Sequence, residues 1–167
     1  DGTDYVLLPS QGENQLHGGP EGFDKRRWRI VQQNDCEVLF ALESADGDQG
    51  FPGNLSASAK FTLTEDNRIS IEYRATVDKP CPVNMTNHAY FNLDGDQSDV
   101  RQHKLQLLAD AWLPVDEMGI PFEGLKAVAG TSFDFRTPKT IAKEFLSDDY
   151  QRKVKGYDHA FLLQAKG

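Results

Sequence analysis

Apolar and polar residues alternate along several short stretches of the chain, which is typical of β-strands with one buried face. In the clearest stretch, residues 68–77, every second position is apolar: Ile69, Ile71, Tyr73, Ala75 and Val77. Residues 58–64 alternate as well, and the Glu65-Asp66-Asn67 segment between the two stretches has the composition of a hairpin turn. The pattern therefore predicts an antiparallel pair of strands.

Shorter apolar or alternating runs predict further strands: Tyr5–Leu8, Arg29–Val31, Cys36–Leu42, Lys104–Ala109, Trp112–Val115, Ser132–Phe135 and Tyr157–Leu163. One helix is predicted over Pro138–Leu146, with Thr137 as its N-cap, and residues 148–155 are interpreted as a charged connection. Glycine-rich loops cover 11–25 and 44–54. Many short strands joined by such loops favour an all-β fold, a sandwich or a barrel.

The stretch 84–93 combines alternation with chemistry. One face of a strand there would carry only polar groups and phenol: Asn84, Thr86, His88, Tyr90 and Asn92. Amide, imidazole and phenol groups together suit a ligand rich in hydroxyls. Because imidazole titrates near neutral pH, His88 is also a candidate proton donor or acceptor. The alternative is a partly buried histidine with a structural role.

Two loop motifs are further candidates. His17 is followed by Gly18 and Gly19, and glycines let the backbone approach a ligand closely. Asp158, before the strand predicted at the end of the chain, could accept hydrogen bonds from sugar hydroxyls. The alternatives are a surface turn for His17 and a solvated strand end for Asp158. The segment 48–53 is interpreted as a structural turn because its proline and glycines account for it.

Composition narrows the function classes. The 167 residues suit one domain, and the net charge of -8 argues against a nucleic acid or an anionic membrane as a partner. No apolar run is long enough to span a membrane, and no signal peptide is recognised. The only cysteines, Cys36 and Cys81, fit a reducing, cytoplasmic compartment, although one disulfide between them stays open.

Other chemistries lack a motif. Nucleophile-elbow, dinucleotide, P-loop and zincin signatures are absent from the sequence, and no two of the four histidines have the i,i+4 spacing of a helical metal site. The sequence therefore predicts neither a metal nor a cofactor.

Four motifs, in this order, resemble the galactose mutarotase (aldose 1-epimerase) family: Leu16-His17-Gly18-Gly19 with Gly22-Phe23-Asp24-Lys25 and Trp28, Gly50-Phe51-Pro52-Gly53, Thr86-Asn87-His88-Ala89-Tyr90-Phe91-Asn92-Leu93, and Gly156-Tyr157-Asp158-His159. The resemblance implies a large antiparallel β-sandwich that interconverts the α and β anomers of galactose, and of glucose, without metal or nucleotide. It implies that His88 is the general acid. It also implies that His17, Tyr90 and Asp158 contact sugar hydroxyls.

The resemblance also implies that the chain is a central part of one sandwich domain, spanning 1–167 and incomplete. The family's glutamate base would follow Gly167, and its substrate-binding arginine would lie well upstream of His17, which only 16 residues precede. Such a piece is expected to be inactive alone and to self-associate through bare apolar strands. Two other functions stay open: a non-catalytic sugar-binding fragment, and an epimerase-like enzyme for phosphorylated hexoses, which would want clustered arginines.

Overall fold

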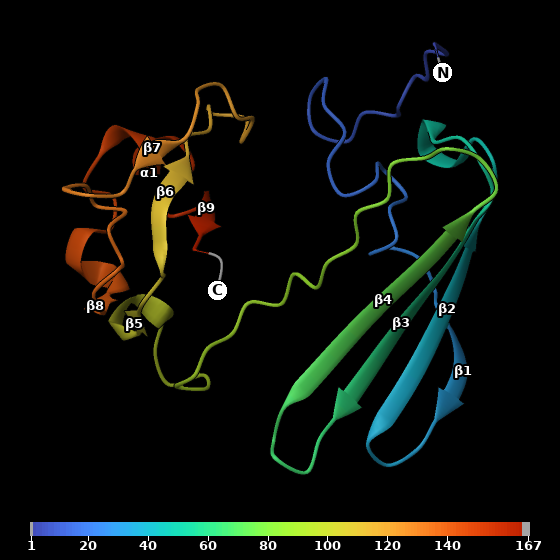
Figure 1. Ribbon diagram of the computed structural model, residues 1–167, viewed down its shortest axis with the longest axis horizontal. Coiled ribbons are helices and arrows are strands. Elements are labelled where there is room, and N and C mark those ends of the chain that lie inside the picture. Colours follow the sequence, from blue (N-terminus) through green and yellow to red (C-terminus); the bar gives the residue numbers. More distant parts are fainter. Residues whose placement is uncertain (1, 165–167) are drawn as a thin grey trace. The chain divides into compact units, whose positions relative to one another are not determined.

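Four antiparallel strands form one sheet in the order β1-β2-β3-β4 (Figure 1). The computed structural model describes residues 2–164, and the chain divides into two units, Asp1–Ala89 and Tyr90–Gly167. The sheet belongs to the first unit, and its strands are β1 Arg29–Gln33, β2 Glu37–Ser44, β3 Leu55–Leu63 and β4 Ile69–Val77. A short 3-10 turn, η1 Asp48–Gly50, lies between β2 and β3.

The register of β3 against β4 places apolar residues opposite one another, with Ala57 paired to Ala75 and Ala59 to Tyr73. Because side chains alternate along a strand, these residues share one face of the sheet. The hairpin between the two strands includes Asn67 at a φ of +59°, a conformation that asparagine tolerates well. The strand pair predicted from the alternation of 58–64 and 68–77 is confirmed.

The second unit contains two small antiparallel sheets. In one, β5 Lys104–Leu105 pairs with β8 Lys139–Thr140. The other has the order β7-β6-β9, from Lys126–Ala127, Ala109–Leu113 and Ala160–Leu163. The second unit also contains the 3-10 turns η2 Val100–Gln102 and η3 Ile141–Glu144 and the α-helix α1 Asp149–Lys153. Trp112, Val128 and Phe133 form the core, and Tyr150, Tyr157 and Phe161 pack against it. With antiparallel sheets and one five-residue α-helix in the described residues, the all-β prediction is confirmed.

Of the predicted helix Pro138–Leu146, only Ile141–Glu144 is helical, as the 3-10 turn η3, and the start of the prediction is wrong. Lys139 and Thr140 instead pair with Leu105 and Lys104, which a local capping signal cannot reveal. The α-helix lies in the segment interpreted as a charged connection, where Asp148 caps α1 by accepting a hydrogen bond from the Gln151 amide at 3.0 Å. The predicted strand at 132–135 is also wrong, because residues 131–134 form a turn closed from Asp134 N to Thr131 O at 3.2 Å.

The strand predicted over 84–93 is not formed in the structure either. Asparagine side chains bond to the backbone there. Asn87 Oδ1 accepts from Ala89 N at 3.0 Å, and Asn92 Oδ1 accepts from Asp94 N at 3.1 Å. Such local bonds compete with strand pairing for the same amide groups. The short apolar run at 5–8 likewise has no strand assignment.

Candidate functional site

His17 occupies the second position of a tight turn in the first unit. Both central residues of the turn have positive φ, +54° at His17 and +81° at Gly18, and Gly19 N donates to Leu16 O at 3.1 Å. Two positive φ values are characteristic of a type I′ turn. A histidine rarely adopts this conformation, and residues in such conformations gather at ligand sites when their surroundings hold them there.

The glycine after this turn lets the loop fold onto itself. Gly22 is buried, and a Cβ added to it would lie 2.1 Å from the carbonyl oxygen of His17. No side chain fits in that space. The sequence suggested that glycines here let the backbone approach a ligand. That prediction, made for Gly18 and Gly19, stays a prediction, and at Gly22 the loop approaches its own backbone.

The structure brings His17 and His88 together. Their ring centroids lie 5.8 Å apart, with the planes tilted by 48°, and both residues are exposed. His88 belongs to the segment after β4. The start of that segment is anchored by Asp78, whose carboxylate accepts from Asn54 N and from Asn54 Nδ2, each at 2.7 Å. Two imidazoles 71 residues apart in sequence therefore form a pair that can donate and accept hydrogen bonds at one surface.

Asp158 lies in the second unit, two residues before β9 begins at Ala160, and is exposed. The two residues that flank it pack inward: Tyr157 lies edge-on to Phe133 at a centroid distance of 5.6 Å, and His159 does so at 4.8 Å. Asp158 itself is exposed between these two rings. Tyr90, at the start of the same unit, is 92% exposed.

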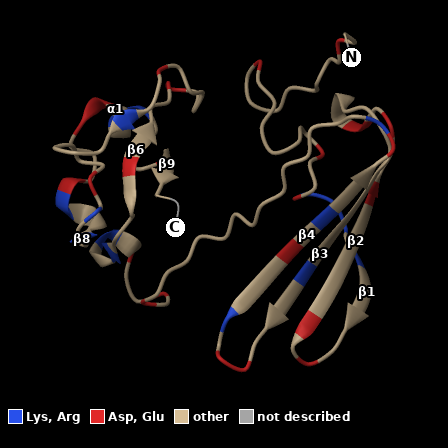
Figure 2. Ribbon diagram, in the orientation of Figure 1, with Lys and Arg blue, Asp and Glu red and all other residues tan. Residues whose placement is uncertain are grey.

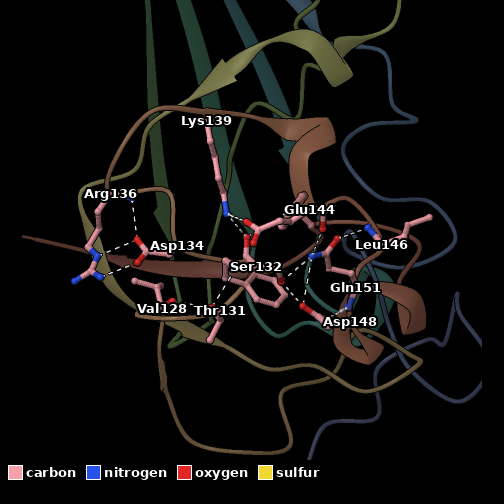
Figure 3. A network of polar contacts seen from close by, with 12 residues as sticks. Val128, Thr131, Ser132, Asp134, Arg136, Lys139, Glu144, Leu146, Asp148 and Gln151 are labelled. Atoms are coloured by element: carbon pink, nitrogen blue, oxygen red, sulfur yellow. Dashed lines mark hydrogen bonds and ion pairs between the residues drawn. The ribbon is translucent and has the colours of Figure 1, made fainter.

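A polar network in the second unit ties α1 to the turn that holds Ser132 (Figure 3). Gln151 at its centre is fully buried. Its Nε2 donates to Ser132 Oγ at 2.8 Å and to the Glu144 carbonyl at 2.9 Å, while Oε1 accepts from Leu146 N at 2.5 Å. Tyr157, next to Asp158, donates its hydroxyl to the Ser132 carbonyl at 3.3 Å. The burial of Gln151 was not predicted from the sequence, because this residue lies among charged residues that indicate a solvated segment.

His159 is half-buried, with both ring nitrogens enclosed in an aromatic environment that makes stability depend on pH. Its ring lies edge-on to Trp112 at 5.1 Å, and neither ring nitrogen has a hydrogen-bond partner among the described residues. Burial therefore lowers the pKa of His159 below its ordinary value, despite the nearby carboxylates of Asp158 and Asp148. The folded chain thus favours the neutral ring.

We expect the free energy of unfolding to fall as the pH drops below about 6.5, where the unfolded chain begins to protonate His159 and the folded chain does not. Urea unfolding at pH 7.5 and pH 5.5 measures this effect. The control His159→Phe keeps a ring in the aromatic environment but cannot titrate, so its pH dependence should be shallower. Equal slopes for both proteins would contradict the assignment.

The arrangement of possible metal ligands and of the two cysteines is defined within residues 2–164. Within that range, no three His, Cys, Asp or Glu side chains are grouped so that they could hold a metal ion. Cys36 and Cys81 are both free thiols, so they do not form the disulfide that the sequence left open. Burial raises the pKa of the Cys81 thiol, which disfavours its reactive thiolate form. Among the described helices, none is long and apolar enough to cross a membrane.

Comparison with known sequences gives a consistent family. A sequence model described as aldose 1-epimerase matches residues 1–166. The aldose 1-epimerase of Escherichia coli (strain K12) is 78% identical over 167 residues, covering 100% of this chain and 48% of that protein. The galactose mutarotase of Bos taurus is 40% identical over 167 residues, covering 98% of this chain and 46% of that protein. The chain spans about half the length of the curated relatives it matches.

Solved structures agree with the sequences. The crystal structure of galactose 1-epimerase from Lactobacillus acidophilus NCFM superposes with a TM-score of 0.87 at 36% identity, covering 97% of this chain and 49% of that one. An aldose epimerase homologue from C. elegans gives a TM-score of 0.79 at 38% identity, covering 86% of this chain and 44% of that one. These matches confirm the predicted fold, the β-sandwich of the mutarotases, present here in part.

Proposed function

Because the chain belongs to the aldose 1-epimerase family, we propose that the whole protein is an isomerase that interconverts the α and β anomers of an aldohexose. Galactose is the expected substrate, and glucose a second one. The observation that carries the proposal is the pairing of His17 and His88, with ring centroids 5.8 Å apart on an exposed surface. Imidazoles at this spacing suit a sugar that must be both held and protonated.

The reaction requires a proton at the ring oxygen and the loss of one from the C1 hydroxyl. His88 is proposed to donate the first proton, which cleaves the bond between C1 and the ring oxygen. Rotation about the C1–C2 bond then lets the ring close on its other face. A positioned acid or base of this kind contributes about 10²–10⁴-fold to the rate. The family pattern assigns the base that takes the C1 proton to a glutamate outside residues 1–167.

The remaining site residues are proposed to bind the sugar. His17, Tyr90 and Asp158 each offer hydrogen-bonding groups suited to hydroxyls, and the Asp158 carboxylate accepts charge-assisted bonds. His17 and Asp158 should therefore act on affinity more than on the chemical step. No metal or other cofactor is needed, because acid and base groups suffice for ring opening.

We expect Asp158→Asn to weaken galactose binding by about 10- to 100-fold, since an amide keeps the shape but loses a charge-assisted bond of about 1.5–3 kcal/mol. His17→Ala should weaken binding as well. Isothermal titration with galactose, on the protein expressed from its complete gene, gives both dissociation constants. Asp149→Asn is the matched control, because that exposed carboxylate in α1 pairs with Arg152 at 2.6 Å and has no proposed role in sugar binding. Unchanged constants for both site variants would refute the binding roles.

The names of the relatives favour an aldose 1-epimerase over the two alternatives, a non-catalytic sugar-binding fragment and an enzyme for phosphorylated hexoses. A phosphohexose enzyme would want clustered arginines; the His17 loop is followed by Arg26 and Arg27, and Arg26 is already paired with Asp48 at 2.6 Å. Polarimetry of α-galactose solutions with the protein from the complete gene tests the assignment: an accelerated change of rotation supports mutarotation. Sugar binding without acceleration would instead indicate a non-catalytic binding protein.

Partners and location are part of the same proposal. The sugar is the expected partner, and nucleic acid and membrane are not expected. Lys and Arg are interspersed with Asp and Glu along the sheet of the first unit (Figure 2), and the net charge is -8. Ile69 and Leu63, at one end of that sheet, are more than half exposed, so the 167-residue piece alone is expected to self-associate. Its free cysteines suit a cytoplasmic location.

A further inference from the structure

The 3-10 turn η1 is bonded to the loop that carries His17. The main-chain carbonyl of Gln49 accepts from Gln15 Nε2 at 3.1 Å, two residues before His17. The side-chain oxygen of Gln49 accepts from the Glu21 amide at 3.1 Å, four residues after it. One residue of η1 thus holds the His17 turn on both sides.

Asp48 adds an ionic contact to the same loop. Its carboxylate pairs with Arg26 Nη2 at 2.6 Å and accepts from Ser44 Oγ at 2.5 Å. The side chain of Asp48 is only 13% exposed. Burial by itself would raise the pKa of Asp48, but hydrogen bonds from Ser44, Gln49 and Arg26 outweigh it and lower the pKa, so the carboxylate stays charged. Arg26 in turn donates from Nε to the Glu21 carbonyl at 3.1 Å.

The backbone of η1 is itself constrained. Gln49 has a φ of +51°, which is uncommon for a residue with a side chain, and the structure around it must hold it there. A Cβ added to the next residue, Gly50, would lie 2.1 Å from the carbonyl oxygen of Val6. The N-terminal segment therefore packs against this turn, and Leu8 N donates to the Gln49 carbonyl at 3.0 Å.

We propose that Asp48 and Gln49 are positioning residues for His17. They fix the His17 turn to the end of β2, and so set the place of its imidazole beside His88, without touching the sugar themselves. The proposal rests on the proposed function, in which His17 binds a sugar hydroxyl. It assigns a role to a turn that the sequence presented as structural only.

The test uses Gln49→Ala and Asp48→Asn in the protein from the complete gene. Each should raise KM for galactose about three- to tenfold, the effect of losing one positioned hydrogen bond, and leave kcat within about twofold. Asp48→Glu, which keeps the carboxylate, should restore part of the affinity. The matched control is Glu37→Gln: it breaks the part-buried Lys60–Glu37 pair of the same sheet, at 2.7 Å, and should leave KM unchanged.

A double-mutant cycle separates positioning from general destabilisation. If Gln49 acts through His17, then Gln49→Ala added to His17→Ala should not raise KM further. A further increase equal to that in the parent protein would overturn the proposal. Thermal unfolding of each variant confirms that it is folded at the assay temperature.

An NMR measurement tests the inference without activity. Nuclear Overhauser contacts between the His17 and His88 ring protons should be present in the parent protein and in Glu37→Gln, and should be lost or weakened in Gln49→Ala. Unchanged contacts in Gln49→Ala would overturn the positioning role even if the parent is active. Conversely, a parent protein that neither binds galactose nor accelerates mutarotation refutes the proposed function, and the ring contacts still decide the role of Gln49.

Discussion

Replacing His88 with asparagine should lower kcat for galactose mutarotation by at least about 100-fold, with KM within about threefold of the parent value. Asparagine keeps a hydrogen-bonding group of similar size but cannot deliver a proton. An interaction made mainly in the transition state lowers kcat when it is removed, while ground-state binding changes little. Polarimetric initial rates over a range of galactose concentrations give both constants.

His103→Asn is the control for this substitution. His103 belongs to the second unit, where its Nε2 lies 3.3 Å from Asp94 Oδ2, and it has no proposed role in the reaction. The kcat of His103→Asn should therefore stay close to the parent value. If His88→Asn retained kcat within tenfold of the parent, His88 would not be the acid. A large rise in KM alone would instead place His88 among the binding residues.

Trp112→Ala should reduce the free energy of unfolding of the second unit by about 3–5 kcal/mol, as expected for truncating a large buried aromatic side chain. Trp112 is 2% exposed and stacks on Phe133 at a centroid distance of 3.8 Å with an interplanar angle of 11°. Chemical unfolding followed by far-UV circular dichroism measures the loss.

Leu162→Ala is the control, since Leu162 lies in β9 beside β6 but is 57% exposed. It should cost well under half as much as Trp112→Ala, because little apolar area leaves contact with the core. Similar losses for both variants would mean that Trp112 is not the centre of this core. Since Asp158 lies two residues before β9, which pairs with the strand that holds Trp112, a folded Trp112→Ala protein is also expected to bind galactose more weakly.

The predictable part of the fold was the part with local signals. The pairing of 58–64 with 68–77 joins strands that are neighbours in sequence, so alternation and one turn sufficed. The strand β8, Lys139–Thr140, pairs with β5, about 35 positions earlier in the chain. Because of this long-range pairing, no helix begins at Thr137 despite its capping signal. Residues 84–93 have the alternation of a strand, but asparagine side chains accept hydrogen bonds from backbone amides there. Those amides are then not available for pairing with another strand.

The candidate site divides in a similar way. His17 and His88 were identified by their own motifs, and the structure places them side by side. Gln49 was missed as a partner of the His17 loop because its contacts join residues 28 and 34 positions apart. The positive φ of Gln49 could not be predicted from the sequence either, since only glycine, asparagine and aspartate adopt that conformation often enough to indicate it.

The contact between Gly22 and the His17 carbonyl has a consequence for protein engineering. A library that randomises the His17 loop to change sugar preference has freedom at Glu13, which is exposed. It has none at position 22, because even the smallest side chain would displace the His17 backbone. Active clones should therefore retain glycine at position 22 whatever sugar is used for selection, and the useful diversity of such a library lies at exposed positions such as Glu13.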